Sequence, residues 1–378
     1  MTRQREYPEL SIAWFVSPHG YGHAGRAAAV MAALHEIEPD LHFHIFTKVP
    51  AWFFECSLTG GFHYHSVMTD IGLVQKNSLE EDLPETVNRL SSFLQSEEEQ
   101  AAELASTINE LECRLAVCDI APLGITAAGK AGIPSVLMEN FTWDWIYEAY
   151  VNHETRMASF IPWLRDRFER ADYLIQTEPV CKPRQANLTT VPAGRRARTP
   201  PEETRDRLGI PEKAKMVLVT MGGVFCRFPF LHELEGLEGI ITVVPGAAED
   251  IERRENLLLL PHQSGFYHPD LIGASDAVIG KIGYSTFAEV YHAGVPFGYI
   301  ARSVFPESPV MVAYVKEHLN GMPVQDSSFL DGSWIAELPE LLSLGRVERP
   351  VPNGADQAAR FIYDLLSCPS GLTAKKGS

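Results

Sequence analysis

The sequence predicts an α/β protein with two domains, and three observations support this. The chain has 378 residues, more than one ordinary domain needs and enough for two. Short apolar runs alternate with longer amphipathic stretches, which is typical of parallel strands joined by helices. The alternation stops in a segment rich in proline and arginine, residues 191–215, and then restarts. We therefore expect one domain over residues 1–195 and a second over 196–350. Residues 351–378 are expected to form one helix and a disordered tail.

Each expected element follows from the position of an apolar run or an amphipathic stretch. In the first half the expected strands are 10–16, 41–46, 62–67, 114–118, 134–138 and, as the last of this half, 173–176. The expected helices are 24–37, a long acidic stretch over 85–112 with one break, 120–131 and 155–170. In the second half the expected strands are 216–220, 240–244, 257–260, 277–279 and 297–300. The expected helices there are 199–208, begun by a capping pair of Thr199 and Glu202, then 285–292, 310–319 and 355–366.

The composition is acidic. Lys and Arg total 32 against 49 Asp and Glu, giving a net charge of −17. Such a surface repels nucleic-acid phosphates and anionic lipids, so we expect no nucleic-acid partner. The six cysteines are scattered, which favours a reducing compartment. The first apolar run is too short for a signal peptide, and no segment is long enough to span a bilayer. We expect a cytoplasmic protein without stable membrane insertion. The sequence does not indicate its oligomeric state.

A glycine-rich loop, residues 17–26, follows the first predicted strand. Its three glycines match the pattern G-x-G-x-x-G, so a dinucleotide site must be considered. That site also needs an acidic residue after the second strand, where this chain has Thr47 and Lys48. In addition, His23 stands where a pyrophosphate needs bare backbone. A nicotinamide dinucleotide is therefore disfavoured.

His23 lies at the expected start of the helix that follows this loop. The positive end of a helix favours a neutral histidine, which is the form that a general base needs. Asp119 ends the strand 114–118 and is a candidate to orient the imidazole. The alternatives are that His19 and His23 only pack or cap, and that Asp119 caps the next helix.

A second glycine turn, within residues 275–289, also joins a strand to a helix. It is not a P-loop, because no Gly-Lys-Ser/Thr string is present. The helix start at Ser285 and Thr286 offers N–H groups and hydroxyls to a diphosphate. Glu289 is placed to accept the hydroxyls of a ribose, but Thr286 and Glu289 also match a capping box. Further candidates for phosphate contact are the cations Lys281 and Arg302 and the glycines Gly222 and Gly223.

These motifs together carry a resemblance. They are Gly-Tyr-Gly-His-Ala-Gly-Arg at 20–26, Asp-Ala-Val-Ile-Gly-Lys-Ile-Gly-Tyr-Ser-Thr at 276–286 with Glu289 and 294–296, and 302–305 with Glu307 and Pro309. Weaker echoes are Asp119 with 132–134, Glu139-Asn140, Gly222-Gly223 and 353–355. The chain resembles the GT-B glycosyltransferases, and within them the glycosyltransferase-like region of L-arabinokinases. It resembles the bacterial cell-wall N-acetylglucosaminyltransferase more distantly.

The resemblance implies two Rossmann-like domains facing across a cleft, with the last helix returning to the first domain. It implies that the N-terminal domain holds the acceptor and the C-terminal domain the donor. By resemblance Glu289 binds the ribose, Glu307 binds the sugar hydroxyls, and the turn of Gly283, Tyr284, Ser285 and Thr286 binds the diphosphate. The acceptor-side residues are then His19, Gly20, Gly22, Arg26, Glu139 and Asn140, beside the pair of His23 and Asp119. Many relatives have Asp-Gln where this chain has Pro306-Glu307-Ser308-Pro309, which leaves the sugar open.

We therefore expect a glycosyltransferase that uses a nucleotide-diphosphate sugar and an unidentified acceptor. The chain has no Asp-x-Asp string, which favours a reaction without a metal or another cofactor. Inversion at the anomeric carbon is expected from the resemblance alone. The alternatives are a nucleotide-sugar epimerase or hydrolase on the same fold, and a non-catalytic nucleotide-sugar-binding protein. No kinase portion follows the last helix, so phosphorylation of arabinose is not expected.

Overall fold

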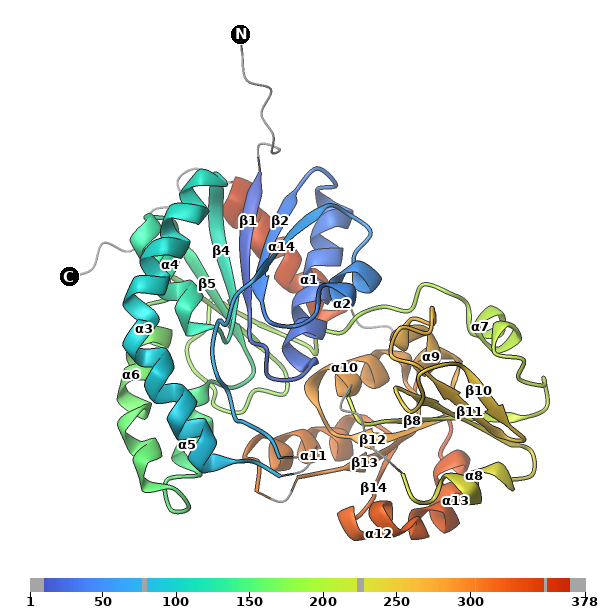
Figure 1. Ribbon diagram of the computed structural model, residues 1–378. Coiled ribbons are helices and arrows are strands. Elements are labelled where there is room, and N and C mark those ends of the chain that lie inside the picture. The colour runs from blue at the N-terminus through green and yellow to red at the C-terminus, as the bar shows by residue number, and fades with distance from the viewer. Residues whose placement is uncertain (1–9, 77–79, 223–227, 303, 350–351, 368–378) are drawn as a thin grey trace. The chain divides into compact units, whose positions relative to one another are not determined.

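The chain divides into two compact units (Figure 1). The computed structural model describes residues 10–76, 80–222, 228–302, 304–349 and 352–367. Of these, residues 10–76, 80–193 and 352–367 form the first unit, and the remainder, from Gly194 onward, form the second. The boundary between Ala193 and Gly194 lies two residues before the one drawn from the sequence.

The described residues of the first unit contain a seven-stranded sheet whose neighbouring strands are all parallel. Its strands are β1 (Ser11–Val16), β2 (His42–Thr47), β3 (Phe62–Ser66), β4 (Cys113–Asp119), β5 (Ser135–Glu139), β6 (Tyr173–Thr177) and β7 (Leu188–Thr190). Their order is β3-β2-β1-β4-β5-β6-β7. The expectation that 173–176 is the last strand of this half is wrong, because β7 adds an edge. With three residues, β7 is too short to give an apolar pattern.

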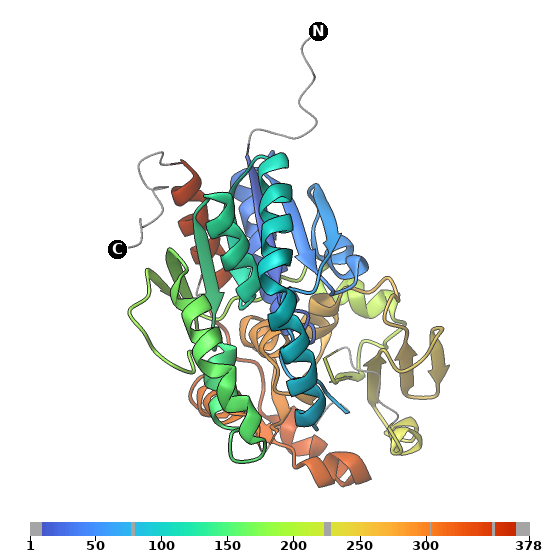
Figure 2. The same ribbon diagram turned by 60° about the vertical axis from the view of Figure 1, so that its left-hand side comes forward.

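Helices cover both faces of this sheet (Figures 1 and 2). They are α1 (Gly22–Ile37), α2 (Ala51–Ser57), α3 (Leu83–Glu110), α4 (Pro122–Ala131), α5 (Trp143–Glu148), the 3₁₀ helix η1 (Thr155–Ser159), α6 (Ile161–Glu169) and α14 (Gly354–Ser367). α1, α2 and α14 lie on one face, and α3, α4 and α6 on the other. Every residue of β1 is buried, as expected for a parallel strand covered on both sides. Trp14 packs in the core beneath α1, whereas Phe15 lies against Gly124 of α4.

Two expected helices differ from the structure. The expected break in 85–112 is wrong, because α3 is one continuous helix of 28 residues. Its buried acid Glu97 is compensated by Thr126 Oγ1 at 2.7 Å and Arg167 Nε at 3.2 Å, so the helix continues past it. Conversely, 155–170 is split into η1 and α6. Pro162, in the first turn of α6, would clash with the preceding turn of a continuous helix.

α14 completes the core of the first unit. Its buried residues Ala355, Ala358 and Ile362 belong to the core cluster that also contains α1. Gly354 N donates to Pro192 O at 3.1 Å, and Gln357 Oε1 accepts from Val191 N at 3.1 Å. The end of the described chain is therefore tied to the segment that leaves the first unit.

The second unit repeats the arrangement. Its described strands are β8 (Lys215–Thr220), β9 (Ile240–Pro245), β10 (Glu252–Arg254), β11 (Leu257–Leu260), β12 (Ala277–Lys281), β13 (Phe297–Ile300) and β14 (Gly321–Pro323). They are ordered β10-β11-β9-β8-β12-β13-β14, and β10 pairs antiparallel while the others pair parallel. The helices are α7 (Pro201–Arg207), α8 (Leu231–Glu235), α9 (His268–Ala274), α10 (Tyr284–Ala293), α11 (Glu307–His318), α12 (Asp326–Asp331), η2 (Ser333–Glu337) and α13 (Leu338–Ser343). Separate apolar clusters fill the two faces of the sheet.

The cap predicted for the first helix of this unit is wrong. α7 begins at Pro201 with Pro200 as its N-cap and no side-chain cap. Thr199 N instead donates to Asp270 Oδ1 at 3.1 Å, and Arg198 N donates to the same oxygen at 2.6 Å. The segment before α7 is therefore held extended against α9.

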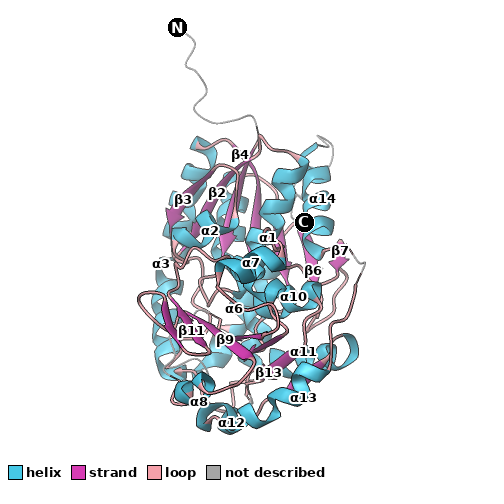
Figure 3. Cartoon of the chain, turned by 90° about the vertical axis from the view of Figure 1, so that its right-hand side faces the viewer, coloured by secondary structure: helices cyan, strands magenta, loops and turns pink. Residues whose placement is uncertain are grey.

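Both sheets are Rossmann-like. In each, the first strand in sequence lies in the interior of the sheet, and the strand order reverses beside it, between β1 and β4 and between β8 and β12. Helices flank the strands of both units (Figure 3). Ligands of such sheets bind outside the carboxyl ends of the strands at the point of reversal. The predicted α/β class with two Rossmann-like domains is confirmed.

Candidate active site

His23 and Asp119 meet at the point of reversal in the first sheet. Asp119 is the last residue of β4, and His23 is the second residue of α1. His23 Nδ1 lies 2.9 Å from Asp119 Oδ1, and both side chains are buried. Because the carboxylate can only accept, Nδ1 carries the proton and Nε2 is left as the basic nitrogen. α4 has no side-chain cap, so the alternative role of Asp119 as its cap is wrong.

Arg26 holds Asp119 from the other side. Its Nε and Nη2 donate to the two carboxylate oxygens at 2.8 and 2.6 Å. Its Nη1 donates to Asn140 Oδ1 at 2.7 Å and to Thr177 Oγ1 at 3.2 Å. Burial by itself raises the pKa of Asp119, but the Arg26 guanidinium and His23 outweigh it, and the pKa lies below its usual value. Asp119 is therefore a carboxylate over the physiological range. Thr177 was not foreseen, because nothing in its sequence context marks it.

The remaining acceptor-side candidates lie around this pair. The ring of His19 packs edge-on against Trp143, with 4.9 Å between centroids, and its Nδ1 accepts from Leu73 N at 3.4 Å. Gly20 has a φ of +68°, which favours glycine, and Gly22 is the first residue of α1. Glu139 belongs to a different group: its Oε1 accepts from Arg184 Nη2 and Gln176 Nε2, both at 2.9 Å.

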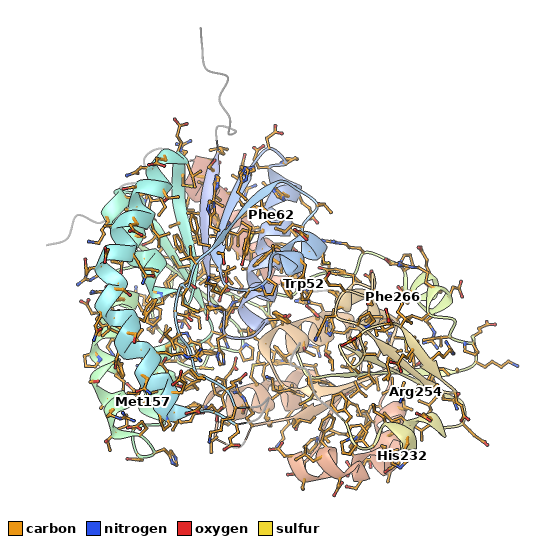
Figure 4. The ribbon with its side chains drawn as sticks, viewed as in Figure 1. Trp52, Phe62, Met157, His232, Arg254 and Phe266 are labelled. Carbon is orange, nitrogen blue, oxygen red and sulfur yellow. The ribbon has the colours of Figure 1, made fainter. Side chains whose placement is uncertain are left out.

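The loop itself is anchored by aromatic packing. Tyr21, the N-cap residue of α1, stacks on Phe53 with 5.1 Å between centroids. It also packs edge-on against Trp52, which is labelled in Figure 4, at 5.8 Å. α2 thus supports the loop that presents His23.

In the second unit, two of the predicted glycines and a cation lie together. A Cβ placed on Gly222 would be 4.0 Å from Cε of Lys281, and one on Gly283 would be 3.9 Å from it. Gly222 has a φ of +69°. Gly283 is the N-cap of α10, so the N–H groups of the first turn, from Tyr284 to Thr286, have no intrahelical acceptor. A cation and a helix N-terminus together favour binding of an anion.

Glu289 lies in the same unit, where three side chains contact its buried carboxylate. Its Oε1 accepts from Arg195 Nε at 2.8 Å and Ser285 Oγ at 3.0 Å, and its Oε2 lies 2.8 Å from His268 Nδ1. His268 Nε2 in turn lies 3.2 Å from Thr220 Oγ1. Burial raises the pKa of Glu289, but Arg195 and His268 outweigh it and lower that pKa to about 2.

The alternative role of Thr286 and Glu289 as a capping box is wrong. Thr286 is not the N-cap of α10, so Thr286 and Glu289 do not form a capping box. Sequence reasoning also missed His268 and Arg195. Arg195 lies in the proline- and arginine-rich segment 191–215, where no motif marks it as a partner of Glu289.

The other donor-side candidates follow the adjacent strand. β13 pairs with β12 so that Ile300 lies beside Lys281, which brings Arg302 to the same edge of the sheet. The Arg302 guanidinium packs 3.6 Å from the centroid of the Phe305 ring. Glu307 is the first residue of α11 and is buried. Gly223 lies outside the described residues, as does the C-terminal tail.

The described residues contain neither a metal cluster nor a membrane-spanning helix. No group of three or more His, Cys, Asp or Glu side chains in them has the arrangement of a metal site. No helix among them is both long enough and apolar enough to cross a membrane.

Known proteins define the class of this fold. No family model matches the chain. A UDP-glucosyltransferase from Polygonum tinctorium superposes with a TM-score of 0.61 and 14% identity, covering 96% of this chain and 100% of that one. The glycotransferase of kitacinnamycin gives 0.59 and 14%, covering 98% and 97%. MurG of Acinetobacter baumannii gives 0.50 and 14%, covering 95% and 99%. The protein has the GT-B fold of glycosyltransferases.

In sequence, the chain is similar to L-arabinokinase from Arabidopsis thaliana. The two are 30% identical over 366 residues, which is 94% of this chain and 34% of that protein. The chain thus spans about a third of the length of this relative. The resemblance predicted from the loops, to GT-B enzymes and to a region of L-arabinokinases, is confirmed.

Proposed function

We propose that this protein is a glycosyltransferase that moves a sugar from a nucleotide-diphosphate sugar to an acceptor hydroxyl. The observation that carries the proposal is the buried contact between His23 Nδ1 and Asp119 Oδ1, 2.9 Å long, at the point of strand reversal. It fixes the tautomer and the orientation of the imidazole, as a general base requires. The first unit then holds the acceptor and the base, and the second unit binds the donor.

The donor side is supported by charge. Lys281 and the N-terminus of α10 offer a positive field to a diphosphate in a protein whose net charge is −17. Arg302, at the same sheet edge, adds a second cation. Glu289 is the proposed ribose ligand. Three of its lone-pair positions already accept from the chain, so a ribose either uses the remaining one or displaces the Ser285 hydroxyl.

The proposed step balances as one displacement. His23 Nε2 takes the proton of the acceptor hydroxyl while its oxygen forms a bond to the anomeric carbon. The bond from that carbon to the diphosphate oxygen breaks, and the nucleoside diphosphate leaves with the electron pair. The cations and the helix N-terminus stabilise the negative charge of this leaving group without a metal ion. Attack from the face opposite the leaving group inverts the anomeric carbon.

The test pairs donor titration with a turnover assay. A thermal-shift screen of UDP-, GDP-, dTDP- and ADP-sugars first identifies the donor, because ligand binding raises apparent stability. In His23→Ala we expect transfer, or slow donor hydrolysis as its surrogate, to fall about 10²–10⁴-fold with donor affinity nearly unchanged. Asp119→Asn should lose less, because the ring stays in place but its tautomer is no longer fixed.

Controls separate this proposal from its alternatives. His153→Ala, an exposed histidine of the first unit, should keep full activity. Full activity in His23→Ala would contradict the mechanism. A collapse of donor affinity in that variant would instead place His23 at the phosphates. Rapid turnover of donor alone would indicate an epimerase or a hydrolase.

A further inference from the structure

Asp70 is a buried carboxyl group that the proposed reaction does not use. It lies in the segment between β3 and α3 and is 2% exposed. Ser17 Oγ contacts Asp70 Oδ1 at 3.0 Å, and Trp143 Nε1 donates to Oδ2 at 3.2 Å. Both partners are neutral, and among the described residues no cation pairs with Asp70. Burying a carboxyl group without a cation beside it costs free energy of folding. We therefore expect Asp70 to have a role that offsets this cost.

The two contacts of Asp70 join parts of the first unit that surround His23. Ser17 follows β1, and its backbone N donates to Asp119 O at 3.2 Å. Trp143 begins α5, and its indole lies 6.2 Å from the ring of His23 and 4.9 Å from that of His19, between centroids. Asp70 therefore holds the indole against which both histidines pack.

The segment that carries Asp70 is itself fixed at this place. Tyr147 Oη donates to Gly72 O at 2.6 Å, and Thr69 Oγ1 donates to Val16 O at 2.8 Å. A Cβ on Gly72 would come within 2.9 Å of His19 and of Trp143. The backbone after Asp70 is thus in close contact with the same two rings.

We propose that Asp70 is a positioning residue, which fixes the indole of Trp143 against His23 through a hydrogen bond. An effect of Asp70 on the reaction rate rests on the proposed function of His23. The hydrogen bond between Trp143 and Asp70 does not rest on that function, and it can be tested without any reaction.

The charge of Asp70 changes near neutral pH. Burial raises the pKa of Asp70 to about 7, the contacts with Ser17 and Trp143 oppose this, and the charge of Asp119 adds to it. The other titratable or charged groups around it are Asp119 with its partner Arg26, Tyr147 on α5, and His19 and His23, whose rings pack against Trp143. An ionised carboxylate accepts a stronger hydrogen bond than a neutral acid does. Trp143 is therefore held more firmly above pH 7 than below it.

Tryptophan fluorescence tests the contact directly. Subtracting the spectrum of a matched Trp143→Phe protein in each background isolates the emission of Trp143. In the wild type we expect this emission to change with a midpoint near pH 7. Asp70→Asn keeps an oxygen for the indole but cannot ionise, so the midpoint should vanish. Asp172→Asn, which alters another carboxyl that accepts from Ser135 N and Oγ, should leave the midpoint in place.

The same fluorescence experiment can overturn the contact. Emission of Trp143 that does not depend on pH in the wild type, or that keeps its midpoint in Asp70→Asn, contradicts the proposal. Far-UV circular dichroism confirms that each variant is folded. Ser17→Ala is a second variant that leaves the bond to Trp143 intact and should retain a midpoint.

Kinetics test the positioning role. We expect Asp70→Ala to lower kcat at least about tenfold because His23 loses its support, with KM for the donor nearly unchanged. An unchanged kcat would overturn positioning. If the midpoint depends on Asp70 but His23→Ala keeps full activity, the contact is supported and only the proposed function fails.

Discussion

Arg26 contributes most of the hydrogen bonds that surround Asp119, so its loss should affect stability as well as activity. In Arg26→Met the buried carboxylate loses its charged partner, and Asn140 loses a donor. Removing one partner of a buried pair typically costs about 3–5 kcal/mol, and we expect this loss in the free energy of unfolding. Urea denaturation measures it. Arg89→Met is the matched control: Arg89 pairs with Glu85, and the two side chains are 55% and 42% exposed, so little change is expected.

Glu289 should combine a stability role with a ligand role. Glu289→Ala leaves Arg195 and His268 without their acceptor, so we expect both a lower melting temperature and weaker nucleotide binding. Calorimetric titration and thermal melting measure the two effects. The control is Asp276→Asn, a carboxylate at the start of β12 that is held by Lys215 and Arg205. It should lower stability and leave nucleotide affinity unchanged. The same outcome in Glu289→Ala would remove Glu289 from the donor site.

The proximity of His23 to Asp119 is predictable from sequence, because each lies near the carboxyl end of a strand in a parallel sheet. The contacts of Glu289 are not. Arg195 and His268 lie 94 and 21 residues away from it in the chain, and no local pattern relates them. The sequence marks Asp70 only weakly as a candidate functional residue, because it is a single acidic residue soon after a predicted strand. Its pairing with Ser17 and Trp143 depends on how three separate loops pack.

At the scale of elements, β2 and β3 carry a group of neighbouring histidines. His42 and His44 on β2 face His63 and His65 on β3, with ring centroids 4.6–5.6 Å apart. Burial lowers the pKa of His44 to about 3, and the charges of His42, His65 and His63 add to this. Burial likewise lowers the pKa of His42 and of His65. The folded protein therefore disfavours protonation of His42, His44 and His65.

This lowered pKa predicts a loss of stability in acid. Below the ordinary histidine pKa of about 6.5 the unfolded chain binds protons that folded His44 does not, so stability falls as pH falls toward 3. Each proton difference contributes about 1.4 kcal/mol per pH unit. Asp70 has the opposite sign, because its raised pKa favours the folded state as pH falls through 7. We expect His44→Phe to flatten the fall in melting temperature between pH 6.5 and pH 4.5. His153→Gln, at an exposed site, should not.

Most long elements could be predicted from sequence because their apolar pattern is strong. β11 and β13 match their predicted bounds, 257–260 and 297–300. The short elements were missed, since a few residues show no period. These are α2, α5, α8, α9, α12, α13, η2, β7, β10 and β14. The break expected in α3 and the cap expected at Thr199 failed for another reason. Tertiary partners, Arg167 for Glu97 and Asp270 for the Thr199 backbone, overrode the local signal.

At the scale of the whole molecule, the first unit depends on α14. Ile362 is fully buried against the α1 side of that core. We expect Ile362→Ala to destabilise the first unit by about 2–5 kcal/mol, through lost burial and the cavity that remains. Differential scanning calorimetry should show one transition shifted and the other, from the second unit, unmoved. Arg360→Ala on the same helix, with its side chain 67% exposed, is the control. A shift of both transitions would contradict independent units.

The return of α14 sets the order in which a ribosome can finish the two units. Val191 and its partner Gln357 are 166 residues apart in the chain. At about 5–20 residues per second, roughly 8–30 s pass between the synthesis of these two residues. The described residues of the second unit all lie between Gly194 and Arg349 and are synthesised within that interval, whereas α1 can pack against α14 only afterwards. The N-terminal unit of the nascent chain is therefore the last to complete its core, because α14 is synthesised after the second unit.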